Sequence, residues 1–159
     1  MERKPAPKHD PPDALDARVF VSLLRTADAL SRGAEALLKP YKLSGTQYNV
    51  LRILRGAGEQ GLACREVGCK LISRDPDITR LLDRMETRGL IARAREKGDR
   101  RVVKTRITPE GLRLLHELDE PVRELHHRQM RHLTATELKQ LSTLLDRARE
   151  PFSDSASSK

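Results

Sequence analysis

Residues 73–91 read SRDPDITRLLDRMETRGLI, and this stretch decides the fold. Asp75 followed by Pro76 predicts a helix start, because aspartate caps helix N-termini and proline fits the first helical position. Apolar residues then recur at helical spacing up to Gly89, where the helix is expected to end. These apolar residues are Ile78, Leu81, Leu82 and Met85. A short helix predicted at about 63–71 precedes it across a tight connection, so the pair has the pattern of a helix-turn-helix.

The residues after this helix change to the pattern of two short strands. Residues 91–95 and 101–107 lie on either side of a turn that contains Gly98, which predicts a β-hairpin. Thr108 and Pro109 then form the start of another helix. A helix-turn-helix followed directly by a hairpin is a winged helix, so the predicted fold class is mainly α with a small β-hairpin wing.

The predicted hairpin is the most basic part of the chain. Residues 93–106 include seven basic and two acidic residues, a net charge of +5, whereas the whole chain carries +8. One sign of charge at this density repels itself unless an anion neutralises it, and a phosphate backbone is a suitable anion. The alternative is that these lysines and arginines only protect a strand edge from aggregation.

The outward face of the predicted reading helix suits contact with bases. Arginine can form a two-pronged contact with guanine, and Asp77 could either accept from a cytosine amino group or orient a neighbouring arginine. Thr79 has two alternatives, a base contact or burial against the preceding helix. The helix and the wing together supply the predicted DNA-binding residues: Ser73, Arg74, Asp77, Thr79, Arg80, Arg84, Arg95, Lys97, Asp99, Arg100 and Arg101.

Both ends of the chain carry apolar stripes that lack a partner surface. Residues 14–40 predict one long helix that ends at Pro40, and Gly33 within it indicates a close approach or a bend. Residues 109–150 predict further helices, the first of which Pro121 should kink or interrupt. Matching stripes at both ends predict a homodimer in which these helices pack around a two-fold axis. The alternative is a monomeric bundle.

The expected organisation has five parts. Residues 1–13 contain four of the nine prolines and predict a disordered arm, and residues 151–159 predict a flexible tail. Between them we expect a dimerisation helix at 14–40, a winged helix-turn-helix module at 41–108 and C-terminal dimerisation helices at 109–150.

Three segments, in order and at matching spacing, resemble the MarR family of bacterial transcription regulators. They are residues 78–91, the wing sequence DRR at 99–101 and the sequence ITPEG at 107–111. The resemblance covers about residues 60–115. It implies a homodimer that binds a pseudo-palindromic operator in double-stranded DNA and is often released by a small molecule or an oxidant. It also implies that Arg101 reaches into the minor groove while Asp99 helps to hold the wing, in agreement with the attraction of arginine to narrow minor grooves.

The sequence therefore predicts a sequence-specific DNA-binding transcriptional regulator, a repressor relieved by a small-molecule effector such as a phenolic compound. The alternative is a non-specific basic nucleic-acid-binding protein, either architectural or RNA-associated. Readers of RNA sequence rely on stacking aromatic residues, whereas this chain has no Trp, two Tyr and two Phe. An effector pocket is expected between the dimerisation helices and the winged module. Phe20, Tyr41 and Tyr48 are its aromatic candidates, with core packing as the alternative for each.

The sequence lacks the motifs of the enzyme classes considered. It has no glycine-rich phosphate loop, no His-Glu-x-x-His and no Gly-x-Ser-x-Gly, so we expect neither an enzyme nor a cofactor. We expect no metal site either, because no cysteine or carboxylate cluster joins the C-terminal histidines, which are interpreted as surface or interface residues. These histidines are His116, His126, His127 and His132. Cys64 is interpreted as a small packed residue, with redox sensing as the alternative.

The chain also carries no recognisable targeting segment. No apolar run reaches the roughly 20 residues that cross a bilayer, and the basic start lacks the apolar stretch of a signal peptide. Cys64 and Cys69 are too far apart on one helix for an unstrained bridge. These features favour a cytoplasmic protein without membrane contact.

Overall fold

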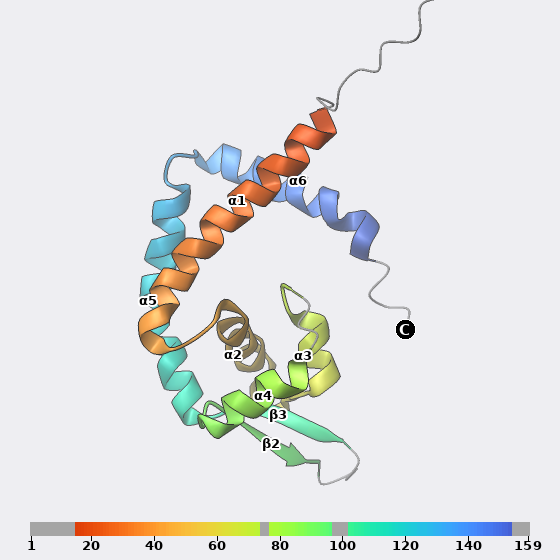
Figure 1. The fold of residues 1–159 in the computed structure, drawn as a ribbon, viewed down its shortest axis with the longest axis vertical. Helices are drawn as coiled ribbons and strands as arrows, with labels where there is room; N and C mark the ends of the chain where they lie inside the picture. Colours follow the sequence, from red (N-terminus) through yellow and green to blue (C-terminus); the bar gives the residue numbers. More distant parts are fainter. Residues whose placement is uncertain (1–14, 74–76, 97–101, 154–159) are drawn as a thin grey trace, which may run out of the picture.

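The computed structural model describes residues 15–73, 77–96 and 102–153, and it is mainly helical (Figure 1). In chain order its elements are α1 (Leu15–Leu38), η1 (Lys39–Tyr41), α2 (Gly45–Ala57), η2 (Gly58–Gln60), β1 (Leu62–Ala63), α3 (Cys64–Lys70), α4 (Ile78–Thr87), β2 (Ile91–Arg95), β3 (Val103–Ile107), α5 (Pro109–Met130) and α6 (Ala135–Ser153). The predicted helix-turn-helix and hairpin are therefore confirmed as α3–α4 and β2–β3. The predicted arm at 1–13 lies outside the described residues, as does most of the predicted tail.

The wing strands form a small antiparallel sheet with the order β1-β3-β2. β2 and β3 pair from Ile91 opposite Ile107 to Arg95 opposite Val103. The two-residue strand β1, which the sequence did not predict, pairs with the other edge of β3 at Leu62 and Ala63. Strand β3 is therefore paired along both edges, with β2 on one side and β1 at Lys104 and Thr105 on the other.

Helix α4 begins later than predicted. Its first residue is Ile78, and Asp77 is the cap, because the Asp77 carboxylate accepts the backbone N–H of Arg80 at 3.3 Å. The predicted start at Asp75 is wrong, and Asp75 and Pro76 themselves lie outside the described residues. The predicted end at Gly89 is confirmed: Gly89 has a φ of +70°, which favours glycine, and its N–H bonds the carbonyl of Glu86 at 2.8 Å.

Helix α5 runs without interruption through Pro121, so the predicted interruption is wrong, whereas the alternative of a kink stays a prediction. A proline removes one helical hydrogen bond, but tertiary packing overrides that local loss. The side chains of Leu118, Val122 and Leu125 around the proline are all buried, and they hold this stretch of the helix against the rest of the molecule.

The apolar core lies in the winged module and the helices next to it. Helices α2, α3, α4 and α5, strand β2 and the C-terminal end of α1 contribute to one cluster. Its fully buried members include Leu51, Leu54, Val67, Leu82, Met85, Ile91, Leu115 and Leu118. This cluster fixes the orientation of α4, because Leu81, Leu82 and Met85 point inward from it.

Helices α1 and α6 differ from the module because their apolar faces are largely uncovered. They cross one another away from the sheet (Figure 1), and residues of both line one hollow, including Leu23 and Leu145. Only Leu38 of α1 is buried, and α6 has no buried residue among those whose burial is described. Gly33 marks a close approach between α1 and α5, because Gln129 fills the space beside it and donates to the carbonyl of Leu30 at 3.1 Å.

Candidate nucleic-acid interface

The outward face of α4 and the β2–β3 hairpin lie at the same end of the molecule, away from α6 (Figure 1). Because the apolar face of α4 is buried, Arg80 and Arg84 point to solvent, and the Arg80 side chain is 83% exposed. This confirms the predicted division of the helix into a buried and an exposed face. The other predicted contacts of the described chain, Ser73, Asp77, Thr79 and Arg95, are exposed as well.

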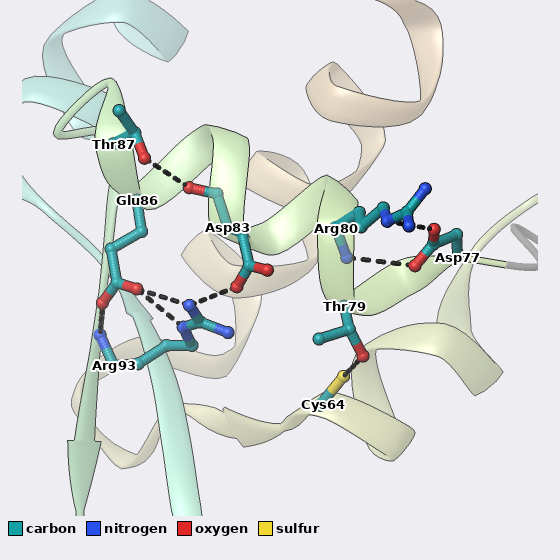
Figure 2. Close-up of polar contacts among 8 residues, drawn as sticks. All are labelled: Cys64, Asp77, Thr79, Arg80, Asp83, Glu86, Thr87 and Arg93. Carbon is teal, nitrogen blue, oxygen red and sulfur yellow. Dashed lines mark hydrogen bonds and ion pairs between the residues drawn. The ribbon is translucent and has the colours of Figure 1, made fainter.

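The first turn of α4 holds an ion pair that the sequence left as one of two alternatives. The Asp77 carboxylate caps the helix and also lies 3.1 Å from Nε of Arg80 (Figure 2). Asp77 therefore orients an arginine at the end of the helix that would meet DNA first. Thr79 lies on the neighbouring side, exposed, with its hydroxyl 4.0 Å from Sγ of Cys64 at the start of α3.

Arg93 of β2 bonds to α4 with both its side chain and its backbone (Figure 2). Its Nε and Nη2 atoms donate to one oxygen of Glu86 at 2.8 and 2.6 Å, and its backbone N–H donates to the other at 3.0 Å. Nη2 also donates to Asp83 at 2.5 Å. The hydrogen bonds from the Arg93 side chain hold the pKa of the Glu86 carboxyl below its ordinary value, so this ion pair persists at neutral pH.

Two more basic residues of the hairpin bond inward. Lys104 pairs with Glu66 at 3.4 Å, and Arg106 donates to the backbone carbonyls of Glu59 at 2.6 Å and Gln60 at 3.4 Å. The charges of Arg93 and Lys104 are therefore partly neutralised by carboxylates, so the hairpin presents less positive charge to an external anion than its sequence predicts. Arg106 keeps its charge, but its side chain is held by neutral carbonyls. Of the hairpin residues predicted to bind DNA, Arg95 is described and exposed.

Several predicted contacts cannot be placed. Arg74, Lys97, Asp99, Arg100 and Arg101 lie outside the described residues. The structure thus places the predicted α4 residues and Arg95 at the end of β2, while the wing tip stays a prediction from the sequence.

The structure also assigns a role to Arg88, which the sequence gave no reason to select. Arg88 follows the last residue of α4 and donates to the carbonyl of Lys42 at 2.7 Å and of Tyr41 at 3.2 Å. Lys42 has a φ of +53° in the turn between α1 and α2. The end of α4 is therefore tied to the connection that leads from α1.

A hollow of about 470 Å³ lies where α1, α5 and the winged module meet. Its lining comes from α1, α2, the α3–α4 connection and His126 of α5. Tyr48 lines it, its ring lies 6.0 Å from the Arg52 guanidinium, and burial raises the pKa of its hydroxyl. The other two aromatic candidates do not line this hollow: Tyr41 packs against the core, and Phe20 is 62% exposed on α1.

The described part of the chain shows neither a metal site nor a membrane-spanning helix. Residues 15–73, 77–96 and 102–153 contain no cluster of three or more histidine, cysteine or acidic side chains placed to hold a metal ion. Within the same ranges, none of the helices has the length and apolar character needed to cross a membrane.

The chain is similar to known regulators over most of its length. The family model described as MarR matches residues 43–103. The HTH-type transcriptional repressor IacR of Pseudomonas putida is 32% identical over 127 residues, which cover 80% of this chain and 75% of IacR. The regulator TtmR of Methylorubrum extorquens is 34% identical over 110 residues, 69% of this chain, and the match spans 55% of the length of TtmR.

Solved structures agree with these matches. A MarR transcription factor from Planctomyces limnophilus is 42% identical with a TM-score of 0.66, and the match covers 84% of this chain and 97% of that one. A mutant MarR from E. coli in complex with operator DNA is 25% identical with a TM-score of 0.75, over 82% of this chain and 93% of that one. CouR from Rhodococcus jostii bound to p-coumaroyl-CoA is 28% identical with a TM-score of 0.74, and the match covers 87% of this chain and 96% of CouR.

Proposed function

Because the chain belongs to the MarR family, we propose that it is a transcriptional regulator that binds a specific site in double-stranded DNA. The observation that carries this proposal is the exposed arginine face of α4, which lies at the same end of the molecule as the basic hairpin. The structure of the similar E. coli MarR with operator DNA supports it. We propose no catalytic activity, in keeping with relatives that are named as regulators and repressors.

In the proposed complex, α4 enters the major groove and the wing follows the backbone into the minor groove. Arg80 and Arg84 reach base edges or phosphates from α4, because both side chains are exposed on the face of the helix that points away from the core. Arg95, the last residue of β2, contacts a phosphate from the end of the strand that leads into the wing tip. The predicted wing-tip residues 97 and 99–101 complete the contact, with Arg101 in the minor groove.

A second copy of the chain is the proposed occupant of the apolar faces of α1 and α6. Exposed apolar side chains extend along both helices, and a contiguous apolar surface of this kind marks an association site. The exposed apolar residues of the two helices include Leu15, Val19, Phe20, Leu24, Leu138, Leu141, Leu144 and Leu145. A two-fold dimer places two copies of α4 on successive turns of the duplex and explains a pseudo-palindromic operator.

The hollow lined by Tyr48 and Arg52 is the proposed effector site. It lies between the helices proposed to dimerise and the module proposed to bind DNA, and it reaches Ile72 and Ser73 just before α4. A small molecule there would contact both parts and could release DNA, so we propose a repressor relieved by an effector. The similar CouR was solved with p-coumaroyl-CoA, which supports a small-molecule ligand.

Selection from a randomised pool of duplexes tests the proposal. The wild-type chain should enrich a two-fold symmetric sequence and bind it at least about a thousandfold more tightly than random duplex at physiological salt. The same preference should persist as salt is raised, because only the phosphate contacts weaken. Enrichment of no sequence, with equal binding to every duplex, would instead favour the non-specific basic protein.

A further inference from the structure

Arg93 is placed at the junction between the reading helix and the wing. Its side chain is 25% exposed, less than those of Glu86 at 37% and Asp83 at 51%. Asp83 and Glu86 are three residues apart and therefore lie on one face of α4. A planar guanidinium that bonds both carboxylates, while the backbone N–H of the same residue bonds one of them, holds β2 to α4 in one orientation.

We propose that Arg93 is a positioning residue for DNA binding. By bonding Glu86 and Asp83 it sets the angle between α4 and the wing, so that both reach the duplex at the same time, and it does not itself contact a phosphate. This inference rests on the proposed function. The Glu86–Arg93–Asp83 cluster is hereafter called the wing clamp. In it the charge of Arg93 binds carboxylates of the protein, whereas the charge of the hairpin sequence suggested that it binds phosphate.

The wing needs such a clamp because its two strands continue past the residues that hold them, as far as the hydrogen bond between Glu96 and Val102. Its base is held by the β1–β3 pairing and by the Lys104–Glu66 ion pair on the side of α3. On the side of α4, Arg93 supplies a side-chain link. A rotation at the base moves the tip by a larger distance, and binding sites lose affinity when their groups are displaced by as little as 1 Å or so.

The wing clamp also controls the charge that α4 presents to DNA. Two carboxylates on a helix beside a phosphate backbone would repel it, and Arg93 neutralises them. If Glu86 were only a repulsive neighbour of the DNA, its replacement by glutamine would strengthen binding. If Glu86 holds Arg93 in place, the same replacement weakens binding, so the sign of the change separates the two roles.

The fold should tolerate loss of the wing clamp. Leu82, Met85 and Ile91 at the junction are fully buried or nearly so, and the backbone of Leu90 bonds to Met85 and Thr108 independently of Arg93. Variants of Arg93 and Glu86 should therefore keep the helical spectrum and a cooperative thermal transition, which must be checked before binding is measured.

The test compares Arg93→Gln with Arg95→Gln on the duplex that the wild-type chain selects. Both changes remove one arginine charge from the same strand, and Arg95 is the matched control because it is exposed and a proposed phosphate contact. Arg95→Gln should weaken binding to selected and random duplex alike and lower the slope of log K against log salt by about 0.9. Arg93→Gln should weaken binding to the selected duplex about tenfold or more, and binding to random duplex by a smaller factor that reflects the unpaired carboxylates of Glu86 and Asp83. The salt slope should fall by less than it does for Arg95→Gln, because no phosphate contact is lost.

Two further variants make the result decisive. Glu86→Gln should weaken binding to the selected duplex although it removes a negative charge, and Glu86→Gln combined with Arg93→Gln should be no weaker than Arg93→Gln alone. Arg93→Lys should fall between wild type and Arg93→Gln, because an ammonium keeps the charge without the two-pronged geometry. Stronger binding by Glu86→Gln, full binding by Arg93→Lys or a salt slope lowered as much for Arg93→Gln as for Arg95→Gln would each overturn the wing clamp. Failure of the wild type to select any sequence would instead overturn the proposed function.

Discussion

The winged module and the two terminal helices α1 and α6 solve the problem of apolar surface in different ways. In the module, apolar side chains of α2, α3 and α4 cover one another and pack against α5, and several charged side chains bond to neighbouring elements. In α1 and α6, large apolar side chains remain exposed along most of the length. The difference teaches that the module carries its own core, whereas the apolar faces of the terminal helices stay uncovered by the described residues, and the proposed dimer rests on this feature.

Both apolar and polar contacts join the module to the helices around it. The C-terminal end of α1 enters the core through Leu38, and Arg55 of α2 bonds Asp119 of α5 at 2.8 Å. Arg88 ties the end of α4 to the turn after α1. A change in the position of α1 or α5 therefore has a direct route to the reading helix.

The largest effect is expected in the core of the module. Leu82→Ala should lower the free energy of unfolding by about 2–5 kcal/mol, because the side chain is fully buried and its loss leaves a cavity. Arg84→Ala on the exposed face of the same helix should change it by less than about 0.5 kcal/mol. Urea unfolding followed by circular dichroism measures both. Similar losses for the two variants would show that the module does not have the self-contained core described above.

The next effect concerns association rather than folding. Leu141→Glu on α6 should raise the dissociation constant of the dimer about a hundredfold or more, because it places an unpaired charge in an apolar contact. Thr143→Glu, on the polar face of the same helix, should change it by no more than about threefold. Analytical ultracentrifugation over a range of concentrations measures both. A wild-type chain that is monomeric at micromolar concentration would contradict the proposal that α1 and α6 are covered by a second copy of the chain.

A smaller effect is expected at the wing tip. Arg101→Ala should weaken binding to the selected duplex roughly tenfold and lower the salt slope by about 1, without unfolding the protein. Arg32→Ala removes the same charge from α1, where Arg32 pairs with Asp28, and should leave the affinity almost unchanged. Titrations at two salt concentrations separate the outcomes, and an unchanged affinity for Arg101→Ala would remove the wing tip from the mechanism.

The smallest effect concerns the ion pair between module and α5. The hydrogen bond from Arg55 lowers the pKa of Asp119 below its ordinary value of 3.8, so the pair stabilises the fold above that pH and the contribution is lost as pH falls through the lower, folded value. Both side chains are more than one-third exposed, so Asp119→Asn should cost less than about 1 kcal/mol at pH 7. The difference from wild type should shrink at acidic pH. If the difference in free energy of unfolding between Asp119→Asn and wild type grew as the pH fell, the lowered pKa of Asp119 would be contradicted.

Much of the fold could be predicted because its signals are local. The end of α4 at Gly89, the two wing strands and the cap of α5 at Thr108 all follow from residue types at fixed offsets. Strand β1 could not be predicted, because two residues have no periodicity. The start of α4 was misplaced because two aspartates compete for the cap, and the path of α5 through Pro121 depends on packing from other elements.

The candidate site was less predictable than the fold because it depends on partners that are distant in sequence. The charge count treated Arg93, Lys104 and Arg106 as free, although each bonds to a group from another element. One signal could have indicated the wing clamp, since Asp83 and Glu86 share a helix face just before a strand that carries an arginine. No local pattern separates Tyr48, which lines the hollow, from Phe20, which does not.

A footprint on the selected duplex tests most directly whether the module reads DNA while the terminal helices pair two copies. Hydroxyl-radical cleavage with the wild-type chain should show two protected half-sites related by a two-fold axis, their centres about 10 base pairs or a multiple of that apart. Leu141→Glu should lose this paired protection at concentrations where the wild type keeps it. Protection of a single half-site by the wild type, or uniform protection without a defined site, would contradict the account.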